Sequence, residues 1–191
     1  KPLLKSDSYM PEGQDDTENW QALISELLTA VESFSVTKLE HQIQQIFSSY
    51  PIHVCRERLI DPVFSALSQR DDKGAAFGFM ESEIVRYTLM RLSAKVSKKN
   101  RTRCVTLIPG TQAPAWGLAL MALELTDLEF SVYLFNRPFS VAASIELVAK
   151  FKNSDTVFYQ DGILKENEKA LLAAALLDHE RLFLWGTAPV L

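Results

Sequence analysis

Hydrophobic positions repeat at helical spacing through the first half of the chain. Across residues 20–28, apolar residues recur at i, i+3, i+4 and i+7, which is the pattern of one buried helix face. Similar patterns predict three further helices, over residues 36–47, 54–67 and 78–96. We expect Pro51 to end the second helix and Pro62 to kink or interrupt the third. Four helices joined by short links predict a helical bundle.

The second half of the chain alternates between short apolar runs and helical patterns. Runs rich in β-branched and aromatic residues predict strands at 103–108, 130–134, 156–159 and 181–185. The segments between them predict helices at 114–125, 140–151 and 165–177. This alternation is typical of a parallel sheet covered by helices on both faces. The chain is therefore predicted to be α/β, with an N-terminal four-helix bundle followed by a flavodoxin- or Rossmann-like parallel sheet of about four strands.

Polar and basic segments separate these parts. Residues 6–19 are polar, contain Pro11 and Gly13 and predict a linker, with Asp16 or Thr17 as the cap of the first helix. The basic run at 97–101 is expected to be a hinge. We therefore expect a linker over 1–16, a helical bundle over 17–97 and an α/β domain over 101–191. Because the chain starts at Lys1 and its first residues resemble the end of a helix, we expect an upstream domain.

Composition narrows the class of protein. The chain has 191 residues, 47% of them hydrophobic and 23% charged, as expected for a soluble protein with a substantial core. The net charge of −4 argues against this segment binding nucleic acid phosphates by itself. No apolar run reaches the roughly 18–20 residues of a membrane span, and no signal peptide opens the chain. The two cysteines lack metal-ligand spacing, so we expect a cytoplasmic protein without a membrane partner.

The turn between the first predicted strand and the next helix is the place where ligands bind in such folds. Its sequence, from Ile108 to Gly117, contains no His, Cys, Asp or Glu. No nucleophile–base pair and no dinucleotide fingerprint is present, and Asp161 alone does not form a magnesium site. The three histidines are scattered, without a partner at ligand spacing, and surface or capping roles are expected for them: His41, His53 and His179. We expect a binding or switching module, not an enzyme, and no metal site.

A four-helix bundle followed by a flavodoxin-like domain resembles the cobalamin-binding modules. These modules also form the effector domain of some MerR-type transcription regulators, including cobalamin-dependent light sensors. The segment from Arg58 to Leu67 is similar to the leucine-rich family helix with an internal proline. Alignment from that proline places the family's Trp, Gly and Glu-His positions on Asp71, Gly74 and Glu81-Ser82.

The remaining family motifs fall in the α/β half. The Asp/Glu-x-His-x-x-Gly motif falls on residues 112–117, and the closing Gly-Gly falls on residues 185–187. The histidine that is the lower cobalt ligand in the family is Pro114 here, which has no donor atom. The acid that orients this histidine is Gln112, and only Glu81, Gly74 and Gly117 of the motif residues persist. The family's upper-face Trp and His are absent, and the chain ends after the fourth strand, so the resemblance implies a degenerate site without cobalamin.

The chain is also similar to the MerR-family activators of curli and biofilm genes, which carry a degenerate cobalamin-type domain that ends early. Their DNA-binding domain ends in a Lys-x-Leu-Leu segment, and Lys1-Pro2-Leu3-Leu4 and Trp20 are similar to it and to the following Trp-led helix. This resemblance implies a homodimeric effector domain, which contacts DNA and RNA polymerase through an N-terminal domain and has a possible small-molecule effector. A cobalamin or small-molecule sensor or carrier module and a ligand-free interaction domain remain as alternatives.

Three polar residues are candidates for ligand binding. Glu81 would reach a ligand between the two halves, or it is an exposed charge near a helix start. Thr111 and Gln112 would bind a small polar or anionic molecule at a helix N-terminus, or they simply cap that helix.

Aromatic residues are the other candidates. Trp116, Phe77 and Phe79 lie close to the expected place of the corrin ring. We expect them to fill that space as core; the alternative is an aromatic pocket for an apolar or planar ligand. Cys55 would be a redox sensor only if neighbouring arginines lowered its pKa. The basic stretch 95–103 would touch DNA flanks or form a solvated hinge.

Overall fold

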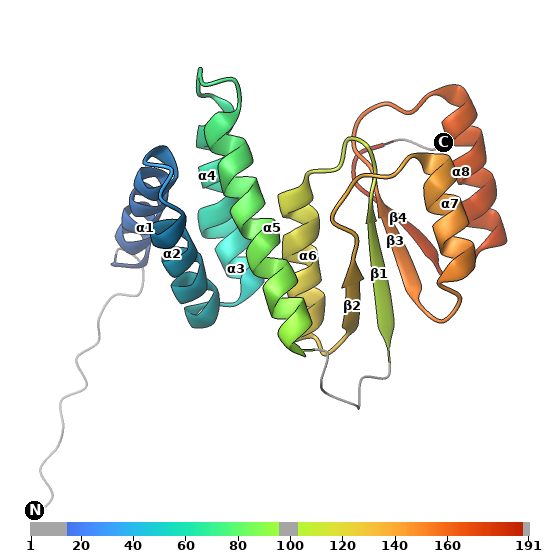
Figure 1. The fold of residues 1–191 in the computed structure, drawn as a ribbon, viewed down its shortest axis with the longest axis horizontal. Helices are drawn as coiled ribbons and strands as arrows, with labels where there is room; N and C mark the ends of the chain where they lie inside the picture. Colours follow the sequence, from blue (N-terminus) through green and yellow to red (C-terminus); the bar gives the residue numbers. More distant parts are fainter. Residues whose placement is uncertain (1–14, 96–102, 189–191) are drawn as a thin grey trace, which may run out of the picture.

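The helical half consists of four rods that pack side by side. The computed structural model describes residues 15–95 and 103–188. Figure 1 shows the rods in sequence order, beginning at the N-terminal end of the described chain. Their segments are α1 (Asp15–Glu32), α2 (Val36–Ser49), α3 (Ile52–Cys55), η1 (Arg56–Ile60), α4 (Asp61–Ser68) and α5 (Ala75–Lys95). The third rod is the continuous run of α3, η1 and α4, so the predicted four-helix bundle is confirmed.

Pro62 interrupts the α-helical hydrogen bonding of the third rod without ending the helix. The preceding segment η1 is a π-helix, in which the Asp61 N–H donates to the carbonyl oxygen of Arg56, five residues earlier. A proline has no N–H and its ring collides with the carbonyl four residues before it, which is that of Arg58. One wider turn relieves this collision and lets the rod continue through the proline.

Helix α1 starts earlier than its apolar pattern predicts. It begins at Asp15, inside the segment expected to be a linker, so Asp16 and Thr17 lie in its first turn and are not its cap. Acidic residues are favoured at the positive N-terminal end of a helix dipole, so the acidic residues at the start of this segment are compatible with a helix. The rest of the predicted linker and the whole predicted hinge, residues 97–101, lie outside the described residues.

The second half is a parallel sheet in which strands and helices alternate along the chain. Its elements are β1 (Cys104–Pro109), α6 (Ala115–Asp127), β2 (Ser131–Leu134), α7 (Val141–Lys150), β3 (Asp155–Tyr159), α8 (Glu166–Asp178) and β4 (Leu182–Trp185). The strand order is β2-β1-β3-β4 and every pairing is parallel. This arrangement confirms the predicted Rossmann-like sheet, and each boundary lies within two residues of its prediction. The chain crosses from one side of β1 to the other between β2 and β3, which makes the gap between β1 and β3 the topological switch point.

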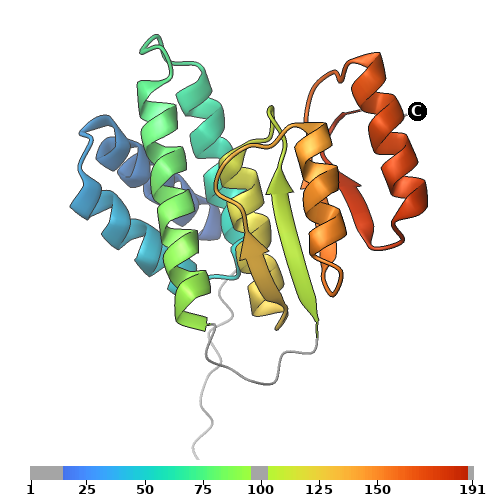
Figure 2. The same ribbon diagram turned by 45° about the vertical axis from the view of Figure 1, so that its right-hand side comes forward.

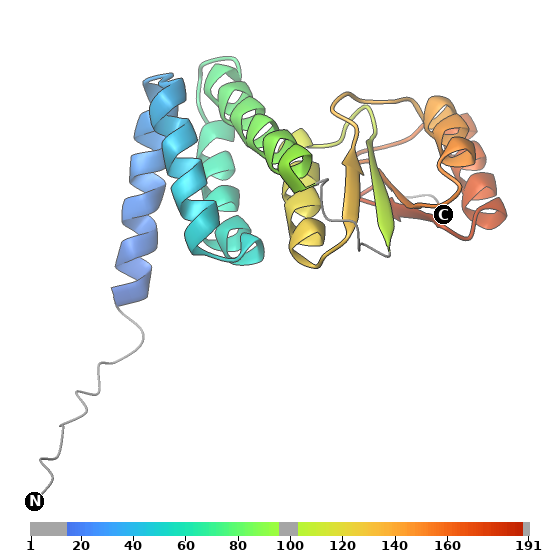
Figure 3. The same cartoon turned by 60° about the horizontal axis from the view of Figure 1, so that its bottom comes forward.

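Helix α6 covers one face of the sheet, and α7 and α8 cover the other (Figures 1 and 3). On the sheet side of α6, Leu118 packs with Leu107 of β1. On its opposite side, Leu120 and Leu123 belong to the core of the bundle, together with Ile84 of α5. Figure 2 shows α5 running alongside α6 at the junction of the two halves. Contact on both sides explains why α6 is apolar all round, as the sequence pattern indicates.

No helix within residues 15–95 and 103–188 combines the length and the apolar character needed to cross a bilayer.

Candidate functional site

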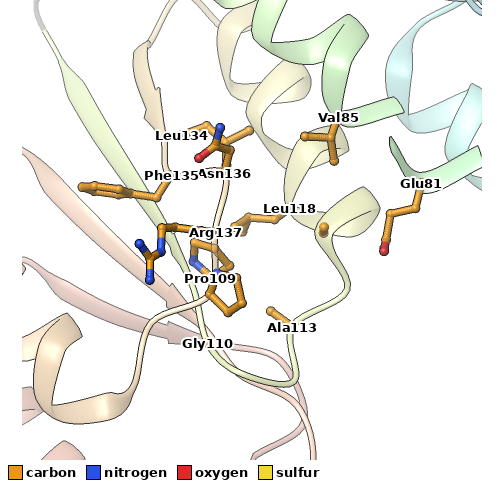
Figure 4. A pocket seen from close by; sticks show the side chains of 12 residues that line it. Glu81, Val85, Pro109, Gly110, Ala113, Leu118, Leu134, Phe135, Asn136 and Arg137 are labelled. Atoms are coloured by element: carbon orange, nitrogen blue, oxygen red, sulfur yellow. The ribbon is translucent and has the colours of Figure 1, made fainter. Parts of the chain in front are cut away.

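A pocket of about 250 Å³ opens where the bundle meets the carboxyl ends of β1 and β2 (Figure 4). One wall comes from α5 and another from the first turns of α6. The end of β1 and the loop after β2 complete the lining. The side chains that line it are mostly apolar, among them Val85, Pro109, Leu118, Leu134 and Phe135. Its polar side chains are Glu81, Asn136 and Arg137.

The switch point itself is filled by protein. Gln160, which directly follows β3, is only 2% exposed and donates from its Nε2 to the carbonyl oxygen of Asp161. The Gly110 N–H donates to the carbonyl oxygen of Tyr159, and a Cβ at Gly110 would lie only 1.8 Å from the Gln160 Oε1 atom. Glycine is therefore needed at the end of β1 because the Gln160 side chain takes the space of a side chain there. The open pocket lies instead on the β1–β2 side.

Glu81 binds the N-terminus of α6. Its Oε2 atom accepts a hydrogen bond of 3.2 Å from the backbone N–H of Trp116, in the first turn of that helix. The N-cap residue of α6 is Pro114, which supplies no side-chain acceptor. A carboxylate from the bundle therefore satisfies a free N–H of α6 in the α/β half. Its negative charge also interacts favourably with the positive N-terminal end of the α6 dipole. Glu81 is half-buried, so its interpretation as an exposed charge is wrong.

Thr111 and Gln112 lie in the turn before α6, where they are exposed and do not line the pocket. They do not cap α6, since Glu81 supplies the acceptor. The Gln112 side chain lies over the turn after β3 instead, where a Cβ at Gly162 would be 1.9 Å from its Oε1 atom. The carboxylate of Glu81 also disfavours an anion at this helix end. The positions of Thr111 and Gln112 therefore do not support the prediction that they bind a small polar or anionic molecule at this helix N-terminus.

The candidate aromatic residues pack as core, as expected. Trp116 stacks on Phe64 of α4 with ring centroids 4.4 Å apart and an angle of 16° between the planes. Phe64 also contacts Phe77, with centroids 4.8 Å apart. Phe79 packs against Phe34 at 5.3 Å and is not part of the pocket. The guanidinium of Arg56 lies over the Trp116 ring, 5.9 Å from its centroid. The contacts of Trp116 with Phe64 and Arg56 lie between the bundle and α6.

The other positions that the resemblance aligns with family motifs lie outside the pocket. Asp71 and Ser82 are exposed, and the Ser82 hydroxyl donates to the carbonyl oxygen of Gly78 within α5. Gly186 has a φ of 107°, and a Cβ there would be 2.3 Å from the carbonyl oxygen of Gln160. No cluster of three or more His, Cys, Asp or Glu side chains able to hold a metal ion occurs among the described residues.

The condition for a redox role of Cys55, a lowered pKa, is not met. Burial raises the pKa of this thiol to about 11, and the hydrogen bond at its own backbone offsets the burial only in part. The arginines that follow it in the sequence, Arg56 and Arg58, do not lower that pKa. A thiol with so high a pKa is protonated at neutral pH and is a poor nucleophile.

The remaining candidates have local roles. Asp161 accepts hydrogen bonds from the backbone N–H and the hydroxyl of Thr187, which ties the end of β3 to the segment after β4. His41 and His53 are exposed, and the backbone N–H of His179 closes the C-terminus of α8. Of the basic stretch, Arg103 is described, and its guanidinium lies 3.6 Å from the carboxylate of Asp155. Residues 96–102 of that stretch lie outside the described part.

The polar residues of the β2–α7 loop were not among the candidates predicted from the sequence. Asn136 and Arg137 follow directly after the second strand, at the same edge of the sheet as the β1 turn. The signal was present, because the carboxyl ends of parallel strands meet at one edge and polar residues there are candidates for binding. Gln160 was missed for a different reason. Its burial depends on a glycine fifty residues earlier in the chain, so its neighbouring residues do not reveal it.

No family model and no curated protein matches this chain. A solved structure, that of the monomethylamine corrinoid protein of Methanosarcina barkeri, is similar to it with a TM-score of 0.51 and 10% sequence identity. The similarity covers 90% of this chain and 86% of that chain. At this identity it shows the fold alone, and it extends over both the bundle and the α/β half. The chain therefore has the fold of a corrinoid protein, a helical bundle followed by a Rossmann-like domain of the cobalamin-binding type.

Proposed function

We propose that this chain is the effector and dimerisation module of a MerR-type transcription regulator, in which the cobalamin-binding-type fold works without cobalamin. The observation that carries this proposal is the stack of Trp116 on Phe64 between the bundle and α6. These rings fill the junction where the resemblance expects the corrin ring. The similarity in fold to a corrinoid protein supports a module of the cobalamin-binding type. The filled junction supports a function of this module that does not use cobalamin.

The residues of the site do not fit a corrinoid. Pro114 stands where the family has its cobalt ligand, and proline offers no side-chain donor to a metal. The switch-point crevice contains Gln160 in place of a nucleotide tail. The open pocket of about 250 Å³ is smaller than the roughly 300–1,000 Å³ typical of sites for drug-sized ligands.

The arrangement supports binding and transmission of a signal, and no catalytic role is proposed. The pocket is lined by α5 of the bundle and by three segments of the α/β half. A ligand that contacts both halves would favour the arrangement that it binds best. In a homodimer this preference would change the spacing of DNA-binding domains linked to each copy. Contact with DNA and RNA polymerase belongs to those domains in this proposal.

The test is gel filtration of the purified chain after incubation with hydroxocobalamin and with adenosylcobalamin, reading absorption and apparent mass together. We expect a peak of dimer size without corrin absorption. The corrinoid protein of Methanosarcina barkeri, treated in parallel, is the positive control. Corrin absorption that elutes with this chain would overturn the proposal and favour the second candidate, a corrinoid carrier or sensor, which the likeness in fold supports. A monomer-sized peak would overturn the dimerisation role.

A further inference from the structure

We infer that the pocket between α5, α6 and the β2–α7 loop binds a small organic monocarboxylate with a branched or cyclic apolar tail. This inference rests on the proposed function, because it names the class of effector that a cobalamin-free module of this fold would sense. Three features of the pocket carry it, namely its size, the character of its walls and the placement of its charges.

The size and walls of the pocket select a small apolar body. A volume of about 250 Å³ has room for roughly eight water-sized groups. The walls are the side chains of Val85, Leu118, Leu134 and Pro109, which offer no hydrogen-bonding atoms. Burial of an alkyl chain or a small ring against them is favourable in proportion to the apolar area removed from water. Polar groups of a ligand that lie against these four side chains would lose their hydration without finding partners there.

The charges at the pocket distinguish its two sides. Figure 4 shows Glu81 on one side and Arg137 on the other. Glu81 already accepts the N–H of Trp116, and its negative charge excludes an anionic head group from that side. Arg137 would repel an ammonium head group on its side of the pocket. On the other side the ammonium would lie beside the positive N-terminal end of the α6 dipole, whose Trp116 N–H the Glu81 carboxylate accepts. An anionic head group therefore belongs on the Arg137 side.

Arg137 is available for such a head group. It is exposed and its guanidinium lies over the Phe139 ring, 5.8 Å from the centroid. In the described part of the chain no carboxylate lies within ion-pair distance of it. A guanidinium presents parallel N–H groups that match the two oxygens of a carboxylate. The neighbouring Asn136 also lines the pocket and carries an amide donor.

The test is isothermal titration calorimetry on the 191-residue chain with three probes that share one tail. The probes are 4-methylpentanoate, 4-methylpentylamine and 4-methylpentan-1-ol. We expect saturable one-to-one binding of the carboxylate and at least tenfold weaker binding of the amine and the alcohol. Arg137→Gln should weaken carboxylate binding by about tenfold or more, since it removes a charge-assisted pair. Arg58→Gln, at an exposed arginine outside the pocket, is the matched control and should leave binding unchanged.

A second variant tests the location of the tail. Val85→Phe adds volume to a half-buried wall residue and should abolish binding of the carboxylate, with far-UV circular dichroism confirming that the variant is folded. Equal binding of the three probes, no saturable binding of the carboxylate, or no effect of Arg137→Gln would each overturn the inference. These outcomes are distinct from failure of the proposed function, which is read from corrin absorption in gel filtration without any carboxylate present.

Discussion

Glu81 acts on a helix other than its own. It lies in α5, yet its carboxylate satisfies the Trp116 N–H at the start of α6, 35 residues later in the chain. Without this acceptor, the first turn of α6 would keep one more unpaired N–H, because Pro114 has no side-chain acceptor to offer. One hydrogen bond therefore joins the bundle to the α/β half beside the candidate pocket.

Replacing this carboxylate should lower stability in a way that depends on the acceptor. Glu81→Ala is expected to reduce the free energy of unfolding by about 1 kcal/mol, the usual effect of losing a helix cap. Glu81→Gln keeps an oxygen acceptor and should lose less. Urea denaturation followed by circular dichroism measures both, with Ser82→Ala at the neighbouring exposed position as the control. Equal losses for the Ala and Gln variants would show that the hydrogen bond is not the cause.

The connection from β1 to α6 has to leave room for Gln160, the residue that follows β3. The strand ends in a Pro-Gly pair whose glycine approaches Gln160, so the turn leaves the sheet without occupying the crevice between β1 and β3. The pair is a turn signal in the sequence by itself. The backbone conformation of Gly110 is one that other residues also adopt, so it does not by itself require glycine. Glycine is required because the Gln160 side chain packs against this position in the folded sheet.

Two glycine substitutions should have opposite effects on stability. Gly110→Ala places a Cβ 1.8 Å from a buried side-chain oxygen and 2.9 Å from the Tyr159 carbonyl oxygen, so we expect a loss of about 1–3 kcal/mol. Gly78→Ala, in α5, meets no heavy atom within 4 Å and should gain about 0.5–1 kcal/mol from its helix preference. Thermal and urea unfolding of the two variants measure the difference. A neutral Gly110→Ala would mean that Gln160 moves away at little cost.

In the whole molecule, α6 belongs to the cores of both halves. One side of this helix packs on the sheet through Leu118, and the other completes the bundle core through Ala119, Leu120 and Leu123. The stack of Trp116 on Phe64 extends the same contact at the start of the helix. The bundle and the α/β half are therefore distinct in sequence pattern but are joined by a continuous apolar interface.

We expect this shared helix to make the chain unfold as one unit. The whole chain should show a single urea transition, with tryptophan fluorescence and circular dichroism changing together. Residues 1–97 and 101–191, expressed separately, should lack a cooperative transition because each exposes the α6 interface. Mixing the two fragments is the control, since reassociation would restore the transition. Two independently cooperative fragments would contradict this expectation and would instead confirm the domain boundaries predicted from the sequence.

The sequence by itself determined the order and type of the helices and strands, and hence the parallel α/β class, because apolar periodicity is a local property of each segment. It also predicted that Trp116 packs as core, because protein interiors are close-packed and do not stay empty. Tertiary structure alone decided the partner of Glu81, the filling of the switch point by Gln160 and the position of the pocket. The first two depend on residues that lie 35 and 50 positions apart in the chain, and the pocket depends on segments from both halves. Their distances are set by packing that no local pattern encodes.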